Sequence, residues 1–282
     1  MKHLVIAGCG DVGTALAERM LQRGWQVSGL RRDPSALPEG IGRIAGDLTE
    51  AQAPADWPAH VDYLVYCPAA GKRDPALYQR LYVDGLRHVL SWASASDSQP
   101  QYLLQVSSTG VYGQSDGEWV TENSPAQATT TTGPLLLQAE DVALRSSIPA
   151  SVVRLGGIYG PGRNRLIEQV RNGLHVPAEP PQYTNRIHRD DAAGLLEHLL
   201  VAAAKGELLA PCYLGVDNEP AALHEVAEWM AQQLGVSLLE HGPTANRMGS
   251  KRCSNALARE SGWVPQYPSY REGYGALLAT NT

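Results

Sequence analysis

Three glycines near the start of the chain have the spacing of a phosphate-binding turn. They follow the apolar run from His3 to Ala7 and lead into a segment with apolar residues at helical spacing. A glycine turn between a buried strand and a helix lets the backbone approach a pyrophosphate, and the helix N-terminus then faces the phosphate charge. The alternative is a glycine-rich turn without a ligand. We expect a dinucleotide site whose contacts in this turn are Gly8, Gly10, Asp11, Val12 and Gly13.

Two arginines follow the next expected strand, which covers residues 26–30. Folds that prefer NAD place an acidic residue here to bind the adenosine ribose. Arg31 and Arg32 stand there instead, and a guanidinium pairs with a 2′-phosphate through charge-assisted hydrogen bonds. The sequence therefore favours NADP over NAD. The alternative is that the two arginines form a solvated turn and that Asp33 supplies the carboxylate for NAD.

Two later strand ends add candidate cofactor contacts. A third strand over residues 43–48 ends in Asp47-Leu48, which we expect to line the adenine. A fourth strand over residues 62–67 is followed by small residues that let a nucleotide approach the backbone. Asp47, Leu48, Ala69 and Ala70 therefore join the expected cofactor contacts.

The elements that must position these residues alternate between strand and helix. Helices are expected over residues 74–94, 135–146, 190–204 and 221–234, and strands over residues 101–106, 151–155 and 212–216. Such alternation predicts the α/β class, with a doubly wound Rossmann-type parallel sheet and its ligand crevice outside the carboxyl ends of the strands. After Gly156 the chain becomes richer in Gly, Pro and Arg. We expect a Rossmann domain over residues 1–160 and a smaller C-terminal substrate lobe over residues 161–282, with part of segment 185–204 packing back on the first domain.

Several ordered motifs together resemble the NAD-dependent epimerase/dehydratase family of the extended short-chain dehydrogenase/reductase superfamily, in its smaller atypical bacterial members. Besides the glycine turn, the resemblance rests on Asp47-Leu48, Tyr82-Val83-Asp84-Gly85, Ser107 to Gly113 (SSTGVYG), Arg154 to Gly160 (RLGGIYG) and Arg186 to Asp191 (RIHRDD). It runs nearly end to end.

The resemblance implies a catalytic hydroxyl but leaves the acid unassigned. In that family a Ser or Thr after the fifth strand polarises the substrate oxygen, and Ser108 has that position. A Tyr four residues before a Lys transfers the proton, because a nearby ammonium stabilises the phenolate. The equivalent positions here are Thr132 and Leu136, and residues 129–142 contain neither Tyr nor Lys. Tyr112 is a candidate donor whose alternative is a structural role in its turn.

Three residues are candidate substrate contacts by the same resemblance. Thr109 lies beside Ser108. Arg163 lines the substrate crevice or caps the following helix. Arg186 clamps an anion such as a diphosphate, or forms a structural salt bridge to Asp190 or Asp191. The segment from Lys251 to Asn255 also recurs in the atypical subgroup, and its basic residues hint at a phosphorylated or carboxylated ligand.

Composition narrows the choice of partners. A net charge of −6 and a pI near 5.8 give no electrostatic footprint for nucleic acid or an anionic membrane. The four cysteines have no CxxC spacing, so we expect reduced thiols and no metal. We expect a cytoplasmic chain without a membrane segment. Its expected partners are a small molecule, with phosphorylated compounds and nucleotide sugars among the candidates, and a second copy of the chain in a homodimer.

Two functions fit these observations. The first is an NADP-binding oxidoreductase that acts on a small carbonyl, hydroxyl or sugar-nucleotide substrate. The second is a non-catalytic NADP(H) sensor or binding module. The absence of the Tyr-Lys pair leaves both open.

Overall fold

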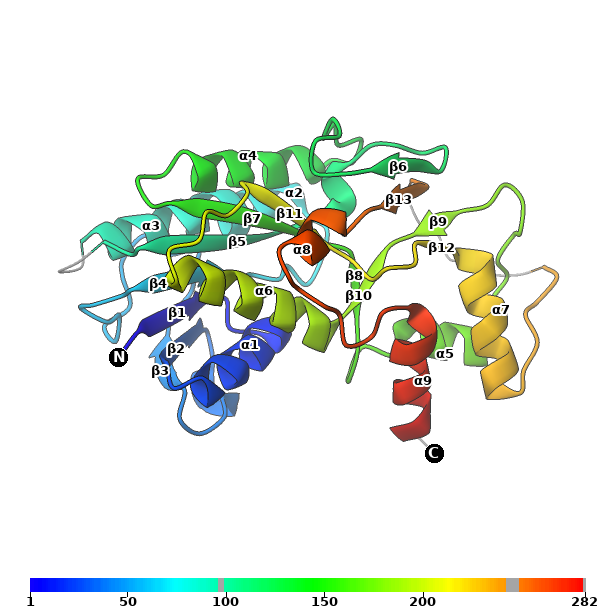
Figure 1. The fold of residues 1–282 in the computed structure, drawn as a ribbon, viewed down its shortest axis with the longest axis horizontal. Coiled ribbons are helices and arrows are strands. Elements are labelled where there is room, and N and C mark those ends of the chain that lie inside the picture. The colour runs from blue at the N-terminus through cyan, green and yellow to red at the C-terminus, as the bar shows by residue number, and fades with distance from the viewer. Residues whose placement is uncertain (96–98, 242–248, 281–282) are drawn as a thin grey trace. The chain divides into compact units, whose positions relative to one another are not determined.

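The centre of the fold is a seven-stranded sheet, seen in a computed structural model that describes residues 1–95, 99–241 and 249–280 (Figure 1). The strand order is β3-β2-β1-β4-β5-β7-β11. These strands are β1 (His3–Ala7), β2 (Gln26–Arg31), β3 (Gly42–Ala45), β4 (Tyr63–Tyr66), β5 (Tyr102–Ser108), β7 (Ala150–Leu155) and β11 (Cys212–Gly215). The sheet is parallel, which confirms the expected Rossmann-type α/β fold.

The central strands are apolar because both of their faces are covered. Every residue of β1 and β4 is buried, as expected for parallel strands packed between helices. The register pairs Ala7 with Leu30 on one side and with Tyr66 on the other. The carboxyl ends of β2, β1, β4 and β5 therefore lie along one edge of the sheet.

Helices cover both faces of the sheet (Figure 1). On one face, α1 (Asp11–Gln22) is tied to α6 (Arg189–Ala204). Arg19 Nε lies 2.5 Å from Glu197 Oε2, and Arg23 pairs with the other oxygen of that carboxylate. The opposite face carries α3 (Gly85–Ser94) and α4 (Gly133–Leu144). Ion pairing between α1 and α6 therefore fixes two helices that are far apart in the sequence.

The helix expected over residues 74–94 has an irregular centre. It begins at Pro75, where the Asp74 carboxylate caps it by accepting a hydrogen bond from Leu77 N at 2.7 Å. After α2 (Pro75–Tyr78) the chain forms π-type turns over Gln79–Asp84 and then continues as α3. At the join, a side chain on Gly85 would lie 2.5 Å from Tyr66 Oη and 2.9 Å from Leu48 O. Only glycine lets the helix lie this close to the sheet.

The chain divides into two compact units that interleave in sequence. Unit 1 comprises residues 1–111, 126–154 and 193–213, and unit 2 comprises residues 112–125, 155–192 and 214–282. The simpler division expected at residue 160 differs from this one because β6 (Glu118–Val120) pairs with β13 (Lys251–Cys253), and β8 (Gly157–Tyr159) pairs with β10 (Arg186–His188). These long-range pairings place residues 112–125 and 155–160, which were expected in the first domain, in unit 2.

Unit 2 has its own apolar core. Its remaining elements are α5 (Arg165–Arg171), β9 (Tyr183–Thr184), β12 (Ala221–Ala222), α7 (Leu223–Leu234), α8 (Ala256–Glu260) and α9 (Tyr270–Thr280). Val170 of α5, Val226 and Met230 of α7 and Tyr270 of α9 are buried together. Among the described residues, no helix of either unit combines the length and hydropathy needed to cross a bilayer.

Candidate functional site

The expected cofactor contacts of unit 1 lie along the carboxyl edge of the sheet. The glycine turn follows β1, Arg31 ends β2, Ala69 and Ala70 follow β4, and Ser108 ends β5. These four strands are adjacent in the order β2-β1-β4-β5. The topology therefore brings together residues that are up to about a hundred positions apart in sequence, at the edge where parallel sheets bind ligands.

The three glycines of the first turn have different structural reasons to be glycine. Gly8 has a φ of +89°, and a Cβ there would lie 2.8 Å from the carbonyl carbon of Cys67. A Cβ on Gly13 would lie 3.1 Å from Ile6 Cγ2, so this glycine allows α1 to pack on β1. A Cβ on Gly10 would approach only Gly8 O, at 4.0 Å. The space above Gly10 is therefore open, as a bound pyrophosphate requires.

The first turn of α1 follows directly and is suited to phosphate. Gly10 is the N-cap residue, with no side chain to cap the helix. Val12 is buried, so only its backbone can reach a ligand, and Asp11 is half-buried. Together with the open space at Gly10, this helix N-terminus fits the pyrophosphate of a dinucleotide.

At the end of β2, the Asp33 carboxylate is engaged in hydrogen bonds, whereas, among the described residues, the Arg31 and Arg32 guanidinium groups are not. Asp33 caps the short helix Pro34–Ala36, because its Oδ1 accepts a hydrogen bond from Ser35 N at 3.0 Å. Hydrogen bonds from Ser35 also hold the pKa of Asp33 below its ordinary value. Arg31 is half-buried and Arg32 is exposed. Within the described ranges, neither guanidinium has an ion pair or a hydrogen bond, so both are available to a phosphate.

Asp47 and Leu48 form the turn after β3. Asp47 Oδ1 accepts hydrogen bonds from the backbone N and the Oγ1 of Thr49, each at 2.9 Å. Leu48 is 6% exposed, and its carbonyl accepts a hydrogen bond from His88 at 3.2 Å. The turn is thus held by its own hydrogen bonds, and contact of Asp47 and Leu48 with adenine stays a prediction.

The loop after β4 is held in place by a side chain of the helical segment Gln79–Asp84. Ala70 N donates a hydrogen bond to Tyr82 Oη at 3.3 Å, while Ala69 is exposed. Burial raises the pKa of Tyr82 to about 12. Tyr82 therefore positions the loop, and its phenol is poorly suited to release a proton near neutral pH.

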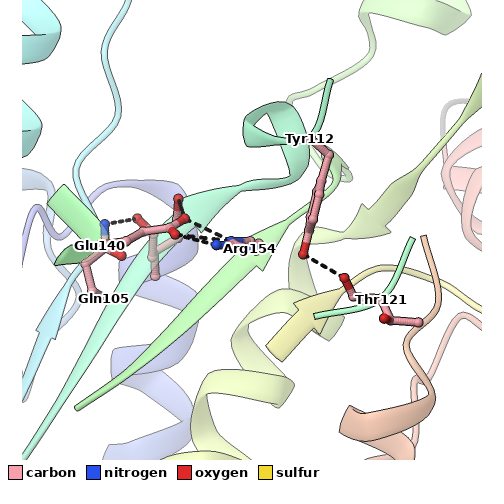
Figure 2. Close-up of polar contacts among 7 residues, drawn as sticks. Gln105, Tyr112, Thr121, Glu140 and Arg154 are labelled. Atoms are coloured by element: carbon pink, nitrogen blue, oxygen red, sulfur yellow. Dashed lines mark hydrogen bonds and ion pairs between the residues drawn. The ribbon is translucent and has the colours of Figure 1, made fainter. Parts of the chain in front are cut away.

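A buried polar network joins Glu140 and Arg154 to Ser107, the residue before the candidate catalytic serine (Figure 2). Ser107 Oγ donates to Glu140 Oε1 at 2.6 Å, and Arg154 Nη2 donates to Glu140 Oε2 at 2.6 Å. All three side chains are at least nine-tenths buried. The network links β5, α4 and β7. It was missed from sequence, although a Ser, a Glu and an Arg in three apolar elements were a visible signal.

Ser108 and Thr109 follow this network. Ser108 is half-buried, and its Oγ accepts a hydrogen bond from Gly110 N at 3.1 Å, which caps the short helix Thr109–Val111. Thr109 is 8% exposed. The Ser108 hydroxyl can still donate a hydrogen bond, so its expected contact with a substrate oxygen remains a prediction.

Thr132 and Leu136, which stand where the family has its Tyr and Lys, lie at the start of α4. Thr132 is the N-cap residue and Leu136 lies one turn later, and both are buried. Tyr112 is buried too, and its Oη donates to the Thr121 carbonyl at 3.0 Å (Figure 2). Its phenolic hydrogen is thus already committed to a backbone carbonyl, which favours the structural role.

Arg163 and Arg186, the other candidate substrate contacts, belong to unit 2. Arg163 is half-buried, and its backbone N donates to Gly160 O at 2.9 Å. Arg186 is 5% exposed, and its guanidinium lies 5.5 Å from the centre of the Tyr270 ring. One guanidinium nitrogen donates to Thr184 Oγ1, and Nη1 has no hydrogen-bond partner among the described residues.

The carboxylates considered as partners of Arg186 are engaged elsewhere. Asp190 pairs with Arg189 at 2.8 Å. Asp191 accepts hydrogen bonds from the backbone N of Gln266 and Tyr267, at 2.6 and 2.9 Å. Asp217 is a carboxyl group that interacts electrostatically with Arg186; burial raises the pKa of Asp217 to about 7, and the guanidinium lowers it only partly.

The parallel sheet and the glycine turn at its carboxyl edge define a dinucleotide-binding α/β protein. Residues 4–191 match the family model of the NAD-dependent epimerase/dehydratase family, and the chain belongs to that family. It therefore has the NAD(P)-dependent, oxidoreductase-like character of that family.

Known proteins resemble the chain over nearly its whole length. A solved structure from Methylobacillus flagellatus, named for the NAD-dependent epimerases/dehydratases, is 36% identical, covers 99% of this chain and 98% of its own, and has a TM-score of 0.82. The 3-diazoavenalumate denitrifying reductase of a Streptomyces species is 26% identical over 98% of this chain and 99% of its own. Protein YeeZ of Escherichia coli is 27% identical over 95% of this chain and 97% of its own.

Proposed function

We propose that this chain is an NADPH-dependent reductase of a small carbonyl compound, with sugar nucleotides included among its candidate substrates. The observation that carries the choice of NADPH is the pair Arg31 and Arg32 at the end of β2, together with Asp33, whose carboxylate caps the next helix. A guanidinium there stabilises a 2′-phosphate, and the carboxylate that would select NAD is engaged by Ser35.

The residues of unit 1 fit the cofactor in three ways. The open space above Gly10 and the N-terminus of α1 suit the pyrophosphate. The turn after β3 suits the adenine half of the cofactor. The loop held by Tyr82 suits a close approach of the nucleotide to the protein backbone. When bound, NADPH supplies the hydride. Ser108 would hold the substrate oxygen by donating its hydroxyl hydrogen.

Catalysis is preferred to the sensor or binding-module alternative for two reasons. Two relatives, the Streptomyces protein and a Stenotrophomonas maltophilia protein named 2-alkyl-3-oxoalkanoate reductase, are named as reductases. In addition, Ser108 keeps its hydroxyl at the carboxyl end of β5. A small molecule is the proposed substrate. We further propose a cytoplasmic location and a homodimer as the assembly to test first.

The cofactor preference is tested by fluorescence titration with NADPH and NADH. The wild-type protein should bind NADPH more tightly than NADH. Replacing Arg31 and Arg32 together with Ala should weaken NADPH binding by roughly 10-fold to 100-fold, since charge-assisted hydrogen bonds contribute about 1.5–3 kcal/mol. NADH binding should hardly change. Arg43→Ala, which alters an exposed arginine on the neighbouring β3, is the control. Equal affinity of the wild-type protein for the two nucleotides would contradict the proposal.

Turnover is tested by following NADPH oxidation with a panel of small ketones, aldehydes, oxoacids and 4-keto sugar nucleotides. Ser108→Ala should lower the rate with the best substrate by about 100-fold, a typical cost of removing one oxyanion-binding donor. Tight NADPH binding without turnover on any member of the panel would favour the binding module instead.

A further inference from the structure

The hydroxyl of Tyr82 has an unused hydrogen at the loop that follows β4. Its oxygen accepts a hydrogen bond from Ala70 N at 3.3 Å. A hydroxyl that accepts in this way still has its own hydrogen to donate, and the described part of the chain offers that hydrogen no acceptor. Tyr82 is half-buried. A donor is therefore available at a loop that is already expected to contact the cofactor.

The residues around Tyr82 hold its side chain in one place. Tyr66, at the carboxyl end of β4, donates its phenolic hydrogen to the carbonyl oxygen of the residue before Tyr82. The side chains at the two ends of the π-type segment are joined, since Gln79 Nε2 donates to Asp84 Oδ1 at 2.9 Å. The rings of Tyr78 and Tyr82 pack together with their centres 4.7 Å apart. A group that is fixed before its ligand arrives loses little entropy when it binds.

The loop beside Tyr82 adjoins the glycine turn that follows β1. A Cβ on Gly8 would lie 2.8 Å from both the carbonyl carbon of Cys67 and the Cα of Pro68, so the turn touches the start of the loop. Ala70, which donates to the Tyr82 hydroxyl, comes two residues later. The Tyr82 phenol also interacts electrostatically with the Cys67 thiol. All of these residues belong to unit 1. A continuous set of contacts therefore links the Tyr82 hydroxyl with the turn expected to hold the pyrophosphate.

The strand order indicates which half of the cofactor Tyr82 faces. Strand β1, whose end carries the expected pyrophosphate site, lies between β2 and β4. Arg31 and Arg32, proposed to bind the 2′-phosphate of the adenosine half, stand at the end of β2. A dinucleotide extends across the strand ends on both sides of its pyrophosphate, so its nicotinamide half is expected over β4 and β5. The ribose of that half is attached directly to the pyrophosphate, and the loop after β4 is the first that it meets.

We propose that the Tyr82 hydroxyl binds the nicotinamide-side ribose of the cofactor, by donating its unused hydrogen to a ribose hydroxyl oxygen. The proposal rests on the proposed function, from which it takes the dinucleotide and its orientation. This ribose is the same in NADPH and NADH. Tyr82 therefore contributes equally to the binding of both nucleotides, whereas Arg31 and Arg32 distinguish between them.

A phenol that stays neutral suits this contact. Burial raises the pKa of Tyr82 to about 12, so the hydroxyl keeps its hydrogen at neutral pH. A phenolate would have no hydrogen to donate and would repel the negative charge of a nearby pyrophosphate. The same property that makes Tyr82 a poor proton donor in catalysis therefore makes it a dependable hydrogen-bond donor in binding.

The first test compares nucleotide affinities of Tyr82→Phe and the matched control Tyr63→Phe by fluorescence or calorimetric titration. Tyr63 lies at the opposite end of β4, where its hydroxyl donates to Gln101 Oε1 at 2.8 Å. Tyr82→Phe should weaken the binding of NADPH and of NADH by the same factor of about 10, the cost of one lost hydrogen bond. Adenosine 2′,5′-bisphosphate, which lacks the nicotinamide half, should bind as it does to the wild type. Tyr63→Phe should leave all three affinities unchanged. An equal loss of affinity for the bisphosphate would overturn the assignment to the nicotinamide half.

Analogues of NADPH that lack the 2′- or the 3′-hydroxyl of the nicotinamide-side ribose separate a direct contact from loop positioning. The wild-type protein should bind at least one of them about 10-fold more weakly than NADPH. Tyr82→Phe should bind that analogue and NADPH with equal affinity, because the two changes remove the same hydrogen bond and their effects do not add.

The outcomes of the analogue titrations are distinguishable. Wild-type protein that binds both analogues as tightly as NADPH overturns the role of Tyr82, and this measurement does not depend on the folding of any variant. Tyr82→Phe protein that discriminates between NADPH and the analogue as the wild type does shows that Tyr82 only holds the loop, and also overturns the contact. Wild-type protein that binds neither NADPH nor NADH overturns the proposed function, and the Tyr82 proposal with it.

Discussion

Glu140 of α4 and Arg154 of β7 form a bidentate ion pair in the interior of unit 1, with Nε–Oε1 and Nη2–Oε2 distances of 3.0 and 2.6 Å (Figure 2). The Glu140 side chain also accepts the Ser107 hydroxyl hydrogen. The pair fixes α4 against the strands although that helix lacks the expected catalytic residues. It also holds the residue immediately before Ser108.

Glu140→Gln should therefore destabilise the fold. The amide keeps the shape of the side chain but leaves the Arg154 guanidinium buried without its counter-ion. We expect the free energy of unfolding to fall by about 3 kcal/mol, measured by urea denaturation. The control is Asp141→Asn at the next residue, whose ion pair with Arg145 joins side chains that are 58% and 80% exposed. It should change stability by less than about 1 kcal/mol. Equal effects of the two substitutions would count against a structural role for the buried pair.

Gly10→Ala should separate binding from folding. The added methyl group meets nothing in the free protein, since only Gly8 O lies near, at 4.0 Å. We expect thermal stability to change little and the NADPH dissociation constant to rise by at least about 10-fold, measured by fluorescence titration. Gly8→Ala should impair folding as well, because of its positive φ and its 2.8 Å approach to the Cys67 backbone. Unaltered NADPH binding by a folded Gly10→Ala protein would refute the assignment of the pyrophosphate site.

Asp217 should make unit 2 sensitive to pH. Burial raises its pKa from 3.8 to about 7, so the folded protein holds a proton there that the unfolded chain releases. Its contribution to stability is full below about pH 4 and is lost as the pH rises through 7. Asp217→Asn should remove this decline, so the difference in free energy of unfolding between variant and wild type should grow in favour of the variant from pH 4 to pH 8. Denaturation curves at several pH values provide the measurement, with the exposed Asp116→Asn as the control. A constant difference across that range would show that Asp217 is ionised in the folded protein.

Two glycines of α9 should respond oppositely to the same substitution. A Cβ on Gly273 would lie 1.8 Å from Tyr159 Oη and 2.6 Å from its Cζ. The Tyr159 ring is held by stacking on Tyr274 at 4.2 Å, so it cannot move aside freely. Gly273→Ala should lower the melting temperature, at a cost of about 1–3 kcal/mol. Gly275→Ala meets nothing within 4 Å and should stabilise the helix by up to about 1 kcal/mol. A rise in melting temperature for both variants would argue against close packing of Gly273 on Tyr159.

The amino-acid sequence determined the cofactor end of this protein because that end is built locally. The strand His3–Ala7, the glycine turn and the helix Asp11–Gln22 are consecutive, and the physical demands on Gly8, Gly10 and Gly13 are met within one short segment and its packing on the next strands. The alternation of strands and helices likewise predicted the parallel sheet, since each crossover is a local unit. The absence of Tyr and Lys from residues 129–142 is also readable directly.

Only the tertiary structure decided which distant residues meet. Lys251 and Tyr112 are 139 residues apart, and the pairing of β13 with β6 that joins them leaves no periodic pattern in either short segment. The division of the chain into interleaved units and the Ser107–Glu140–Arg154 network arise in the same way. Such contacts depend on how the side chains of elements that are distant in sequence fit together, and no local sequence pattern records that fit.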